Sequence, residues 1–575
     1  MQRALPYPFR FAAAVLLFLG AAASSGASAA QVAPQPFSRR YILVFANLGR
    51  AEDRTKVSEI ARRAAAAGYN GLLLGSKAGE YIDLWNREPS AEYADAFARL
   101  GKELAALHMI FIPYALNASE VAYAAPELAE AIPCRDTPFV VQNGVATMAP
   151  TEKLLLENGD FDQFDDQAPK AWGCDKPGAI TFRDAQVKHG GSASVRIENT
   201  AKGDPKNGHG RLWQTVSVTP FRAYEFSVWV KTEKLTDTHA MQFYFEGADG
   251  GQPLVYANRE AGFGGGVAET QDWTRYTIRF NSASNSRLEL YLGIWSPQST
   301  GRLWIDDAEM HEIGLFHTVR RDSLPVKVAA ATGDVVYEEG RDYRVADGKL
   351  EIPAGSQIKD DARLKVSWYQ RAEMIGAPFA NASHDKYFEV ERGIAKHLDA
   401  LFQHPPGFMM TYDEWRVANW DPAAGPITAG EYMAATEKKT EALLREINPK
   451  YELFVWSDMF DPNENAEKRY FMCNGPLTDS WKDLSKETTI MTWVGGVKAL
   501  KFFSDLGLPQ VIGGYYSSME NVKDWLDNLD AAEAQGAKGI DGFMYTTWDD
   551  NFADIEKVAQ VITARGRWPT KQGGR

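Results

Sequence analysis

The ten residues GFMMTYDEWR, at positions 407–416, are the stretch on which the fold and the site of this chain depend. An apolar run typical of a buried strand ends directly in two carboxylates, Asp413 and Glu414, with aromatic residues and Arg416 beside them. Charged residues rarely follow a core strand directly unless they have a function. At the carboxyl end of a strand in a parallel α/β barrel, such groups usually point into the active site. The alternative is a solvated strand end, at which Arg416 neutralises Asp413 or Glu414.

Strand and helix patterns alternate on both sides of this stretch, which is itself the fourth expected strand. The other strands are expected at 41–47, 71–75, 109–116, 452–459, 488–494, 510–516 and 542–548. Helices are expected at 52–67, 91–107, 388–402, 429–447, 497–506, 521–535 and 553–564. Alternating strand–helix units imply a parallel sheet with right-handed crossovers. Eight strands are the number of a closed (β/α)8 TIM barrel, although a doubly wound open sheet has the same pattern.

The helical period is interrupted after the third strand. Residues 151–315 show short segments that alternate aromatic and polar residues between Gly-, Ser- and Asn-rich turns, which predicts an antiparallel β-sandwich of jelly-roll type. Residues 316–370 form a second, small β-rich module. The predicted fold is therefore a TIM barrel, made of residues 37–150 and 371–570, that is split after its third strand by these two insertions.

The first 30 residues have the features of an export signal. Arg3 and Arg10 precede an apolar segment at 11–23, and small residues at 27–29 predict cleavage near Ala29 or Ala30. No later segment is long and apolar enough to span a bilayer, so we expect no membrane insertion and a periplasmic or secreted protein. The net charge of −14 disfavours nucleic acid as a partner.

The composition favours a carbohydrate partner and argues against a metal enzyme. The chain has 16 Trp, and tryptophan rings stack well on the apolar faces of sugars. Its 9 His form no zinc-binding pattern, so we expect no cofactor, although a structural calcium near Glu157 or Asp160 is an alternative. Of three cysteines, Cys134 and Cys174 are the candidates for one disulfide.

Aromatic residues also follow the last four expected strands, and carboxylates accompany them on two. The residues concerned are Trp456, Asp458, Trp493, Tyr515, Tyr516, Trp548, Asp549 and Asp550. Together with Asp413 and Glu414 they describe an aromatic box around acids, which is the composition of a sugar subsite. We therefore expect an oligosaccharide or glycoconjugate substrate.

The distribution of acids indicates how such a sugar would be cleaved. The usual glycosidase uses two carboxylates, but the seventh strand ends in tyrosines and its nearest acid, Glu520, lies four residues beyond Tyr516. An adjacent Asp–Glu pair suits a mechanism in which the substrate's own 2-acetamido oxygen attacks the anomeric carbon. Glu414 would protonate the leaving oxygen and Asp413 would orient the acetamido group; two close carboxylates raise one pKa, and we expect Glu414 to keep the proton.

Two alternatives remain open at this point. A barrel glycosidase of another specificity would use a protein nucleophile or base, with Asp458, Glu520 or Asp550 as the partner of the pair. A glycan-binding protein with a catalytically inactive barrel would use the aromatic box for binding alone.

The motifs around these residues resemble those of glycoside hydrolase family 20, the β-N-acetylhexosaminidases. The resemblance covers the barrel and is carried by YDE at 412–414, WSDM at 456–459, Trp493, the tyrosine pair 515–516 and TWDDN at 547–551. It implies that Asp413 and Glu414 are the catalytic pair and that Tyr515 or Tyr516 binds the acetamido carbonyl. The three tryptophans would line the sugar, and Asp549 or Asp550 would bind its outer hydroxyls, while Arg416 is a further candidate for substrate contact. Family 123, the β-N-acetylgalactosaminidases, has the same pair and is the alternative.

The insertion has a resemblance of its own. ENGDF at 157–161, HGGSA at 189–193 and LWIDD at 303–307 resemble a carbohydrate-binding jelly-roll. Because many such modules only pack against their catalytic domain, we expect its six tryptophans to belong to the core rather than to a ligand platform; they are Trp172, Trp213, Trp229, Trp273, Trp295 and Trp304.

Overall fold

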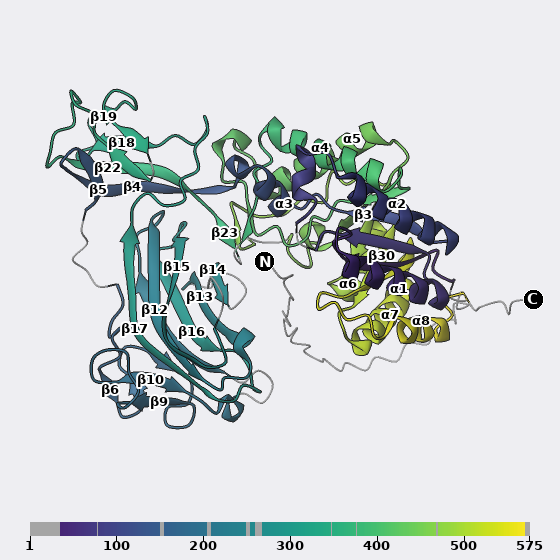
Figure 1. Cartoon of the computed structure of the whole chain (residues 1–575), viewed down its shortest axis with the longest axis horizontal. Helices are drawn as coiled ribbons and strands as arrows, with labels where there is room; N and C mark the ends of the chain where they lie inside the picture. Colours follow the sequence, from purple (N-terminus) through teal and green to yellow (C-terminus); the bar gives the residue numbers. More distant parts are fainter. Residues whose placement is uncertain are drawn as a thin grey trace, which may run out of the picture.

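The computed structural model describes residues 35–77, 79–149, 155–203, 209–248, 253–258, 267–346, 348–374, 377–466 and 470–569. The expected export signal at residues 1–30 lies outside these ranges. Figure 1 shows a helix-coated barrel, a β-sandwich beside it and a smaller β module next to the sandwich. Among the described residues, no helix is both long and apolar enough to cross a membrane.

The barrel is closed and has eight strands in the order β1-β2-β3-β25-β27-β29-β30-β31. The strands are β1 (Arg39–Phe45), β2 (Gly71–Gly75), β3 (Ile110–Tyr114), β25 (Gly407–Met409), β27 (Glu452–Trp456), β29 (Thr488–Thr492), β30 (Gln510–Tyr515) and β31 (Ile540–Thr546). All neighbours are parallel, and β1 pairs with both β2 and β31, which closes the ring. The structure thus confirms the predicted barrel, interrupted after its third strand, and excludes the open sheet.

The barrel interior is filled by large apolar side chains, so the strands are buried on both faces and read as continuous apolar runs. The interior cluster consists of Tyr41, Leu43, Leu73, Ile112, Tyr114, Met409, Phe454, Trp456, Met491, Val511 and Met544. The glycines of β2 make room for this filling. A Cβ atom at Gly71 would lie 2.6 Å from the ring of Tyr41, and one at Gly75 would lie 2.6 Å from the ring of Phe45.

Helices follow the strands and cover the barrel (Figure 1). They are α1 (Ala51–Ala67), α2 (Ala91–Ala106), α3 (Ala118–Ala124), α4 (Asp385–Leu401), α5 (Ala429–Ile447), α6 (Gly496–Asp505), α7 (Met519–Ala534) and α8 (Ile555–Ala564). The longest, α5, begins with a capping box between Thr428 and Glu431, which satisfies backbone donors at its first turn. α4 packs against α5.

The inserted sandwich has two five-stranded sheets. One has the order β15 (Gln271–Asn281), β12 (Ala223–Glu233), β17 (Arg302–Ile313), β10 (Ser194–Ile197) and β9 (Thr181–Asp184). The other has the order β14 (Pro253–Asn258), β13 (Met241–Gly247), β16 (Arg287–Ile294), β11 (Gly210–Ser217) and β8 (Gly173–Cys174). Of the six tryptophans expected in the core, only Trp172 and Trp304 are buried. The expectation is wrong for Trp213, Trp229, Trp273 and Trp295, which are half-buried because they lie on outward-facing positions of the sandwich.

The small module is a seven-stranded sheet with the order β19-β18-β22-β4-β5-β21-β20. Its strands are β19 (Val336–Tyr337), β18 (Lys327–Ala330), β22 (Arg363–Arg371), β4 (Ala131–Gln142), β5 (Val145–Met148), β21 (Lys349–Glu351) and β20 (Arg344–Ala346). β4 and β5 therefore pair with the module, whereas the sequence-based division placed residues 37–150 in the barrel. Cys134 is buried in this module and Cys174 lies in the sandwich, and both are free; the expected disulfide is wrong because the two residues belong to different domains.

The inserted domains contact the loops that follow the barrel strands. Arg321, from the module, donates to Asp421 in the loop after β25 at 2.6 Å. Phe221 of the sandwich packs edge-on against Trp420 of the same loop, with ring centroids 6.2 Å apart. Figure 1 shows α3, which follows β3, between the barrel and these domains. The insertions thus lie on the side of the barrel where parallel strands end and active sites form.

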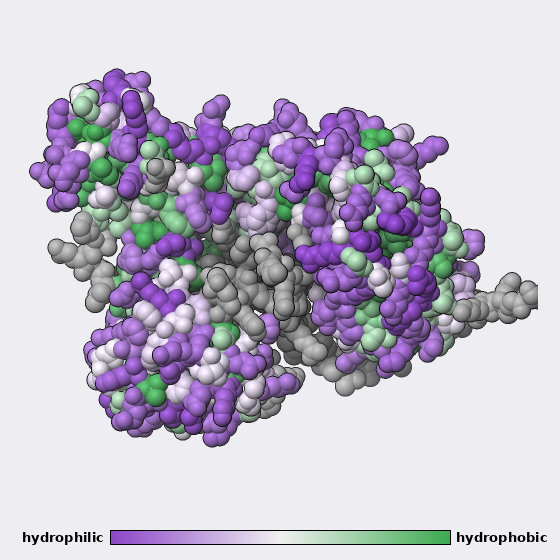
Figure 2. Space-filling view, viewed as in Figure 1, coloured by the Kyte–Doolittle hydropathy of each residue, from purple (hydrophilic) through white to green (hydrophobic). Residues whose placement is uncertain are grey.

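The surface agrees with the acidic, polar composition. Figure 2 shows one face on which hydrophilic residues predominate and apolar residues form small separate spots over all three domains. Isolated apolar residues of this kind are normal on a folded domain.

Candidate active site

The residues after β25 form a loop with an unusual backbone. Thr411, Tyr412 and Glu414 have φ angles of 63°, 66° and 43°, in the left-handed region that residues with a side chain rarely adopt. This conformation costs roughly 1–2 kcal/mol per residue, and such strain concentrates at functional sites. We refer to residues 411–416 as the site loop.

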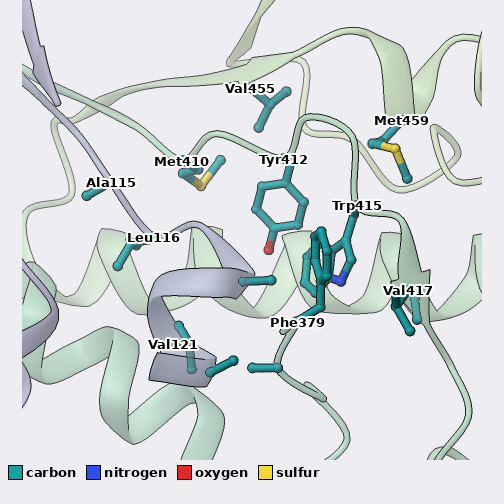
Figure 3. Packing of buried hydrophobic residues seen from close by; sticks show 14 of the residues in the cluster. Ala115, Leu116, Val121, Phe379, Met410, Tyr412, Trp415, Val417, Val455 and Met459 are labelled. Carbon is teal, nitrogen blue, oxygen red and sulfur yellow. The ribbon is translucent and has the colours of Figure 1, made fainter. Parts of the chain in front are cut away.

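Tyr412 and Trp415 anchor the site loop in the helical layer. Figure 3 shows the two rings side by side above Phe379, among apolar residues of several elements. Their centroids are 5.5 Å apart, and the Tyr412 ring also packs on Phe460 at 5.9 Å. Because these two anchors flank the acids, Asp413 and Glu414 are left to contact the ends of the neighbouring strands.

Glu414 makes two contacts that define its place. Its carboxylate accepts a hydrogen bond from Arg416 at 2.5 Å, and its backbone N–H donates to Asp458 Oδ2 at 2.9 Å. Arg416 also lies over the ring of Phe471, 5.5 Å from its centroid. The pairing of Arg416 with one of the two acids, considered as an alternative from the sequence, is present. Arg416 is thus paired with Glu414, whose backbone N–H still donates to Asp458.

Asp413 is the acid of the site loop whose pKa is raised. Burial raises its pKa to about 8, with the negative charges of Asp458 and Glu414 adding to the effect. Its Oδ1 atom is buried and has no hydrogen-bond partner in the described part of the chain. The sequence argument placed the proton on Glu414. In the structure the raised pKa is that of Asp413, because its carboxyl is desolvated and faces the charges of Asp458 and Glu414.

Asp458, after β27, joins the site loop to the next strands. It accepts hydrogen bonds from the Glu414 backbone, from Trp493 Nε1 at 3.0 Å and from Asn465 Nδ2 at 2.8 Å. Burial raises its pKa to about 6 in spite of these donors, and the charge of Glu414 adds to the shift. Asn465 was missed in the sequence, since a single amide in a loop has no spacing that singles it out.

The three tryptophans at the strand ends differ in burial. Trp456 is 1% exposed, and its Nε1 donates to the Tyr114 hydroxyl at 3.0 Å. Trp493 and Trp548 are half-buried and lie 6.3 and 6.2 Å from the Trp456 ring. The structure therefore brings together the three tryptophans that the sequence placed in one cavity.

The two tyrosines that end β30 have different surroundings. Tyr516 packs on Trp493 with centroids 6.1 Å apart, and burial together with the charges of Asp458 and Asp413 raises its pKa well above the usual value. Tyr515 instead donates to Asp554 at 2.7 Å and stacks on Tyr545 in the outer layer. Tyr516 belongs to the site, and the expectation for Tyr515 is wrong because its side chain points away from the barrel mouth.

Asp549 and Asp550 are exposed residues of the loop after β31. Asp549 accepts hydrogen bonds from Ser517 and Thr547, at 2.5 and 2.6 Å. Asp550 forms ion pairs with Lys56 and Lys77. Glu520 is exposed in the first turn of α7. Asp549 and Asp550 therefore bond to residues outside the cluster around Asp413 and Asp458.

A small cavity of about 10 Å³ adjoins Asp413 on the side of the helical layer. Its lining includes Asn117, Phe379, Tyr412 and Trp415. This volume suits one water-sized group and is far below that of a sugar site. In the described ranges, no group of three or more His, Cys, Asp and Glu residues is arranged to hold a metal ion, either here or near Glu157 and Asp160.

A second aromatic surface lies on the sandwich. Trp213, Tyr291 and Tyr244 are direct neighbours in register across β11, β16 and β13. Their ring centroids are 6.5 Å apart for Trp213–Tyr291 and 5.6 Å for Tyr244–Tyr291, and all three side chains are half-buried. Glu246 and Glu289 follow them at the next outward position. We refer to Trp213, Tyr291 and Tyr244 as the aromatic row; it was missed in the sequence, although strict alternation along β11, β13 and β16 is the signal that places these rings on the outer face.

Comparison with known proteins identifies the sandwich. Residues 153–300 match the sequence model of a family described as a carbohydrate binding domain. No curated protein sequence matches the chain. The chain thus contains a domain of the carbohydrate-binding type, inserted into a protein with an eight-stranded parallel barrel.

Solved structures resemble the chain more distantly. TmCBM61, in complex with β-1,4-galactotriose, is 14% identical and covers 28% of this chain and 99% of its own, with a TM-score of 0.21. The CBM22-1 xylan-binding domain of Paenibacillus barcinonensis Xyn10C is 19% identical and covers 29% and 97%, with a TM-score of 0.20. A rhamnosidase from Novosphingobium sp. PP1Y is 10% identical and covers 92% of this chain and 59% of its own, with a TM-score of 0.33. Scores this low carry no conclusion about activity.

Proposed function

We propose that the protein is an exported glycoside hydrolase that removes β-linked N-acetylhexosamine residues at the barrel mouth. The observation that carries the proposal is the convergence of Asp413, Glu414 and Asp458 with Trp493 and Tyr516. These residues come from four consecutive strand ends of the barrel, β25, β27, β29 and β30. Acids with raised pKa values beside stacking aromatic rings are what cleavage of a glycosidic bond needs.

The raised pKa of Asp413, which favours one proton on the acid pair near neutral pH, supports a substrate-assisted mechanism. A bound 2-acetamido group would donate its N–H to the Asp413 carboxylate, and a hydrogen bond to the charged form favours that form. The proton is then retained by its neighbour Glu414, because two adjacent carboxylates resist ionising together. Glu414 gives the proton to the leaving oxygen while the acetamido oxygen attacks the anomeric carbon and the glycosidic bond breaks. The Tyr516 hydroxyl, which donates to the Gly513 carbonyl at 2.8 Å in the free protein, would turn to hold the acetamido oxygen. Arg416 releases Glu414 in this step.

The proposal is tested with paired aryl glycosides. The protein should cleave aryl β-N-acetylglucosaminide or aryl β-N-acetylgalactosaminide, and it should not cleave the matching glycosides that have a hydroxyl in place of the acetamido group. A thiazoline analogue of the N-acetyl sugar should inhibit at lower concentration than the sugar itself, since it resembles the intermediate of this mechanism. Cleavage of the hydroxyl glycosides without inhibition by the thiazoline would reject substrate assistance.

One observation supports the alternative with a protein base. Of Asp458, Glu520 and Asp550, only Asp458 contacts the Asp413–Glu414 pair. If the hydroxyl glycosides are cleaved, Asp458 is the partner of the pair, and Asp458→Asn should then abolish turnover.

We further propose that the aromatic row binds the glycan that carries the substrate. Tyrosine and tryptophan rings in line present a flat apolar surface to successive sugars, and the carboxylates beside them accept hydrogen bonds from hydroxyls. Trp213→Ala and Tyr291→Ala should each weaken binding to a β-linked polysaccharide in affinity electrophoresis. Trp229→Ala, on the other sheet, is the matched control and should retain binding.

A further inference from the structure

A chain of buried hydrogen bonds runs from the site loop into the helical layer. The Tyr412 hydroxyl donates to Thr440 Oγ1 at 3.0 Å, and the Thr440 hydroxyl donates to Glu391 Oε2 at 2.7 Å. Thr440 lies on α5 and Glu391 on α4. The exposed fractions are 3% for Tyr412 and 0% for both Thr440 and Glu391. The site loop is therefore bonded to two helices that take no part in the barrel mouth.

The direction of this chain follows from the chemistry of its groups. Thr440 has one hydroxyl hydrogen, which it gives to the Glu391 carboxyl, so the Tyr412 hydroxyl must be the donor to Thr440. Burial raises the pKa of Glu391 to about 8, and the groups around it are the hydroxyls of Thr440 and Tyr387. A carboxyl that is neutral at neutral pH is compatible with this apolar layer, whereas a charged one is not. The chain thus ends in a neutral acceptor.

The opposite side of the loop is tied to the barrel. The Trp456 backbone N–H donates to the Thr411 carbonyl at 2.9 Å, and the Glu414 backbone N–H donates to Asp458. Thr411 and Glu414 are therefore held by β27 and its loop, while Tyr412 between them is pulled toward α5. Opposed tethers of this kind can maintain the three left-handed residues, whose strain would otherwise relax.

We propose that Tyr412, Thr440 and Glu391 are positioning residues that hold Asp413 and Glu414 at the barrel mouth. The hydrogen-bond chain keeps the site loop in its left-handed conformation, and this conformation directs the two acids toward Asp458. None of the three touches the sugar in this scheme. The kinetic part of the inference rests on the proposed glycosidase function; the structural part does not.

The kinetic test uses substitutions that remove single groups. Tyr412→Phe and Thr440→Val should each lower kcat about tenfold with KM changed less than twofold, because a misplaced pair still leaves the sugar's stacking contacts. The double variant should lose no more than either single one, since each breaks the same chain. Glu391→Gln keeps a neutral acceptor and should retain kcat, whereas Glu391→Leu should lose it. Additive losses in the double variant, or equal kcat for Glu391→Leu and Glu391→Gln, would overturn the inference.

Tyr432→Phe is the matched control. Tyr432 is also 3% exposed, lies on α5, and its hydroxyl accepts a hydrogen bond from the Ala382 backbone at 2.6 Å. This variant should lower the unfolding temperature about as much as Tyr412→Phe and leave kcat unchanged. A tenfold loss of kcat in Tyr432→Phe would mean that any cavity in this layer has the same effect, and the inference would be wrong.

A measurement without substrate separates the inference from the proposed function. Amide hydrogen exchange in residues 411–416 should be about tenfold faster in Tyr412→Phe than in the wild type, and unchanged in Tyr432→Phe. If the wild type cleaves no N-acetylhexosaminide but the exchange result holds, the proposed function fails and the positioning chain stands. If exchange is equal in all three proteins, the positioning chain fails whatever the activity.

Discussion

The barrel mouth and the aromatic row of the sandwich both present aromatic rings beside carboxylates, but they differ in how far the carboxylates are desolvated. At the mouth, the Oδ1 atom of Asp413 is shielded from solvent and the pKa of this carboxyl is raised to about 8. On the sandwich, Trp213, Tyr291 and Tyr244 are half-buried on an open sheet face. A desolvated acid beside a second acid keeps one proton on the pair, whereas an open row of rings can only hold a sugar chain. We therefore propose that the same residue types serve two functions, which the surrounding structure separates.

The largest difference between the two regions should appear on removing the acid beside Asp413. We expect Glu414→Gln to lower kcat on an aryl N-acetylhexosaminide by about 10³-fold, within the range of general acid catalysis, since the amide cannot give a proton to the leaving oxygen. Steady-state kinetics with circular dichroism as a fold control checks this. Turnover within tenfold of the wild type would show that Glu414 does not donate the proton to the leaving oxygen.

The second prediction uses the pH dependence that distinguishes the mouth. The native pKa of Asp413, about 8, lies above the ordinary value of 3.8, so the folded state holds this proton more firmly than the unfolded state. The part of the free energy of unfolding that depends on this proton is fully present below about pH 4, and it is lost as the pH rises to about 8. Asp413→Asn should therefore flatten the fall of the unfolding temperature between pH 5 and pH 9, and should lower kcat about 10²-fold. An unchanged slope in calorimetry would show that Asp413 ionises normally.

The third prediction concerns the sandwich alone. Trp213→Ala should weaken binding of a β-linked polysaccharide about fivefold, because one stacking contact is worth about 1 kcal/mol. The kcat/KM for a small soluble aryl glycoside should remain that of the wild type. If hydrolysis of the small substrate falls in parallel with binding of the polysaccharide, the two regions are not independent.

The smallest effect is expected for an acid at the rim of the mouth. Asp550→Asn should change kcat/KM less than about twofold, because its side chain is exposed and paired with Lys56 and Lys77. The resemblance to family 20 implied that Asp549 or Asp550 binds sugar hydroxyls. A loss above tenfold would place Asp550 in the sugar subsite after all and extend the mouth beyond the cluster around Asp413.

The strand count, the split of the barrel and the character of the insertion could be predicted from the sequence. These features depend on hydrophobic periodicity, which is local: apolar runs for β1 and β27, amphipathic periods for α5, alternation for β11. The proposed catalytic pair could be found for the same reason, since Asp413 and Glu414 directly follow an apolar strand. The free cysteines and the pairing of β4 and β5 with the module could not, because both depend on contacts between distant segments.

The site required the tertiary structure. Tyr515 and Tyr516 are neighbours in sequence and look equivalent, yet the φ angles of 103° and 42° at the end of β30 send one ring outward and the other to Trp493. Asp413 and Glu414 look equivalent too, yet Arg416 pairs with Glu414, while desolvation and the charges of Asp458 and Glu414 raise the pKa of Asp413.

By itself the sequence determined which strands would be buried and which acids would end them, because polarity and period act on neighbouring residues. Only the tertiary structure decided which charged groups are desolvated and with which partners they pair, because burial and pairing depend on segments far apart along the chain.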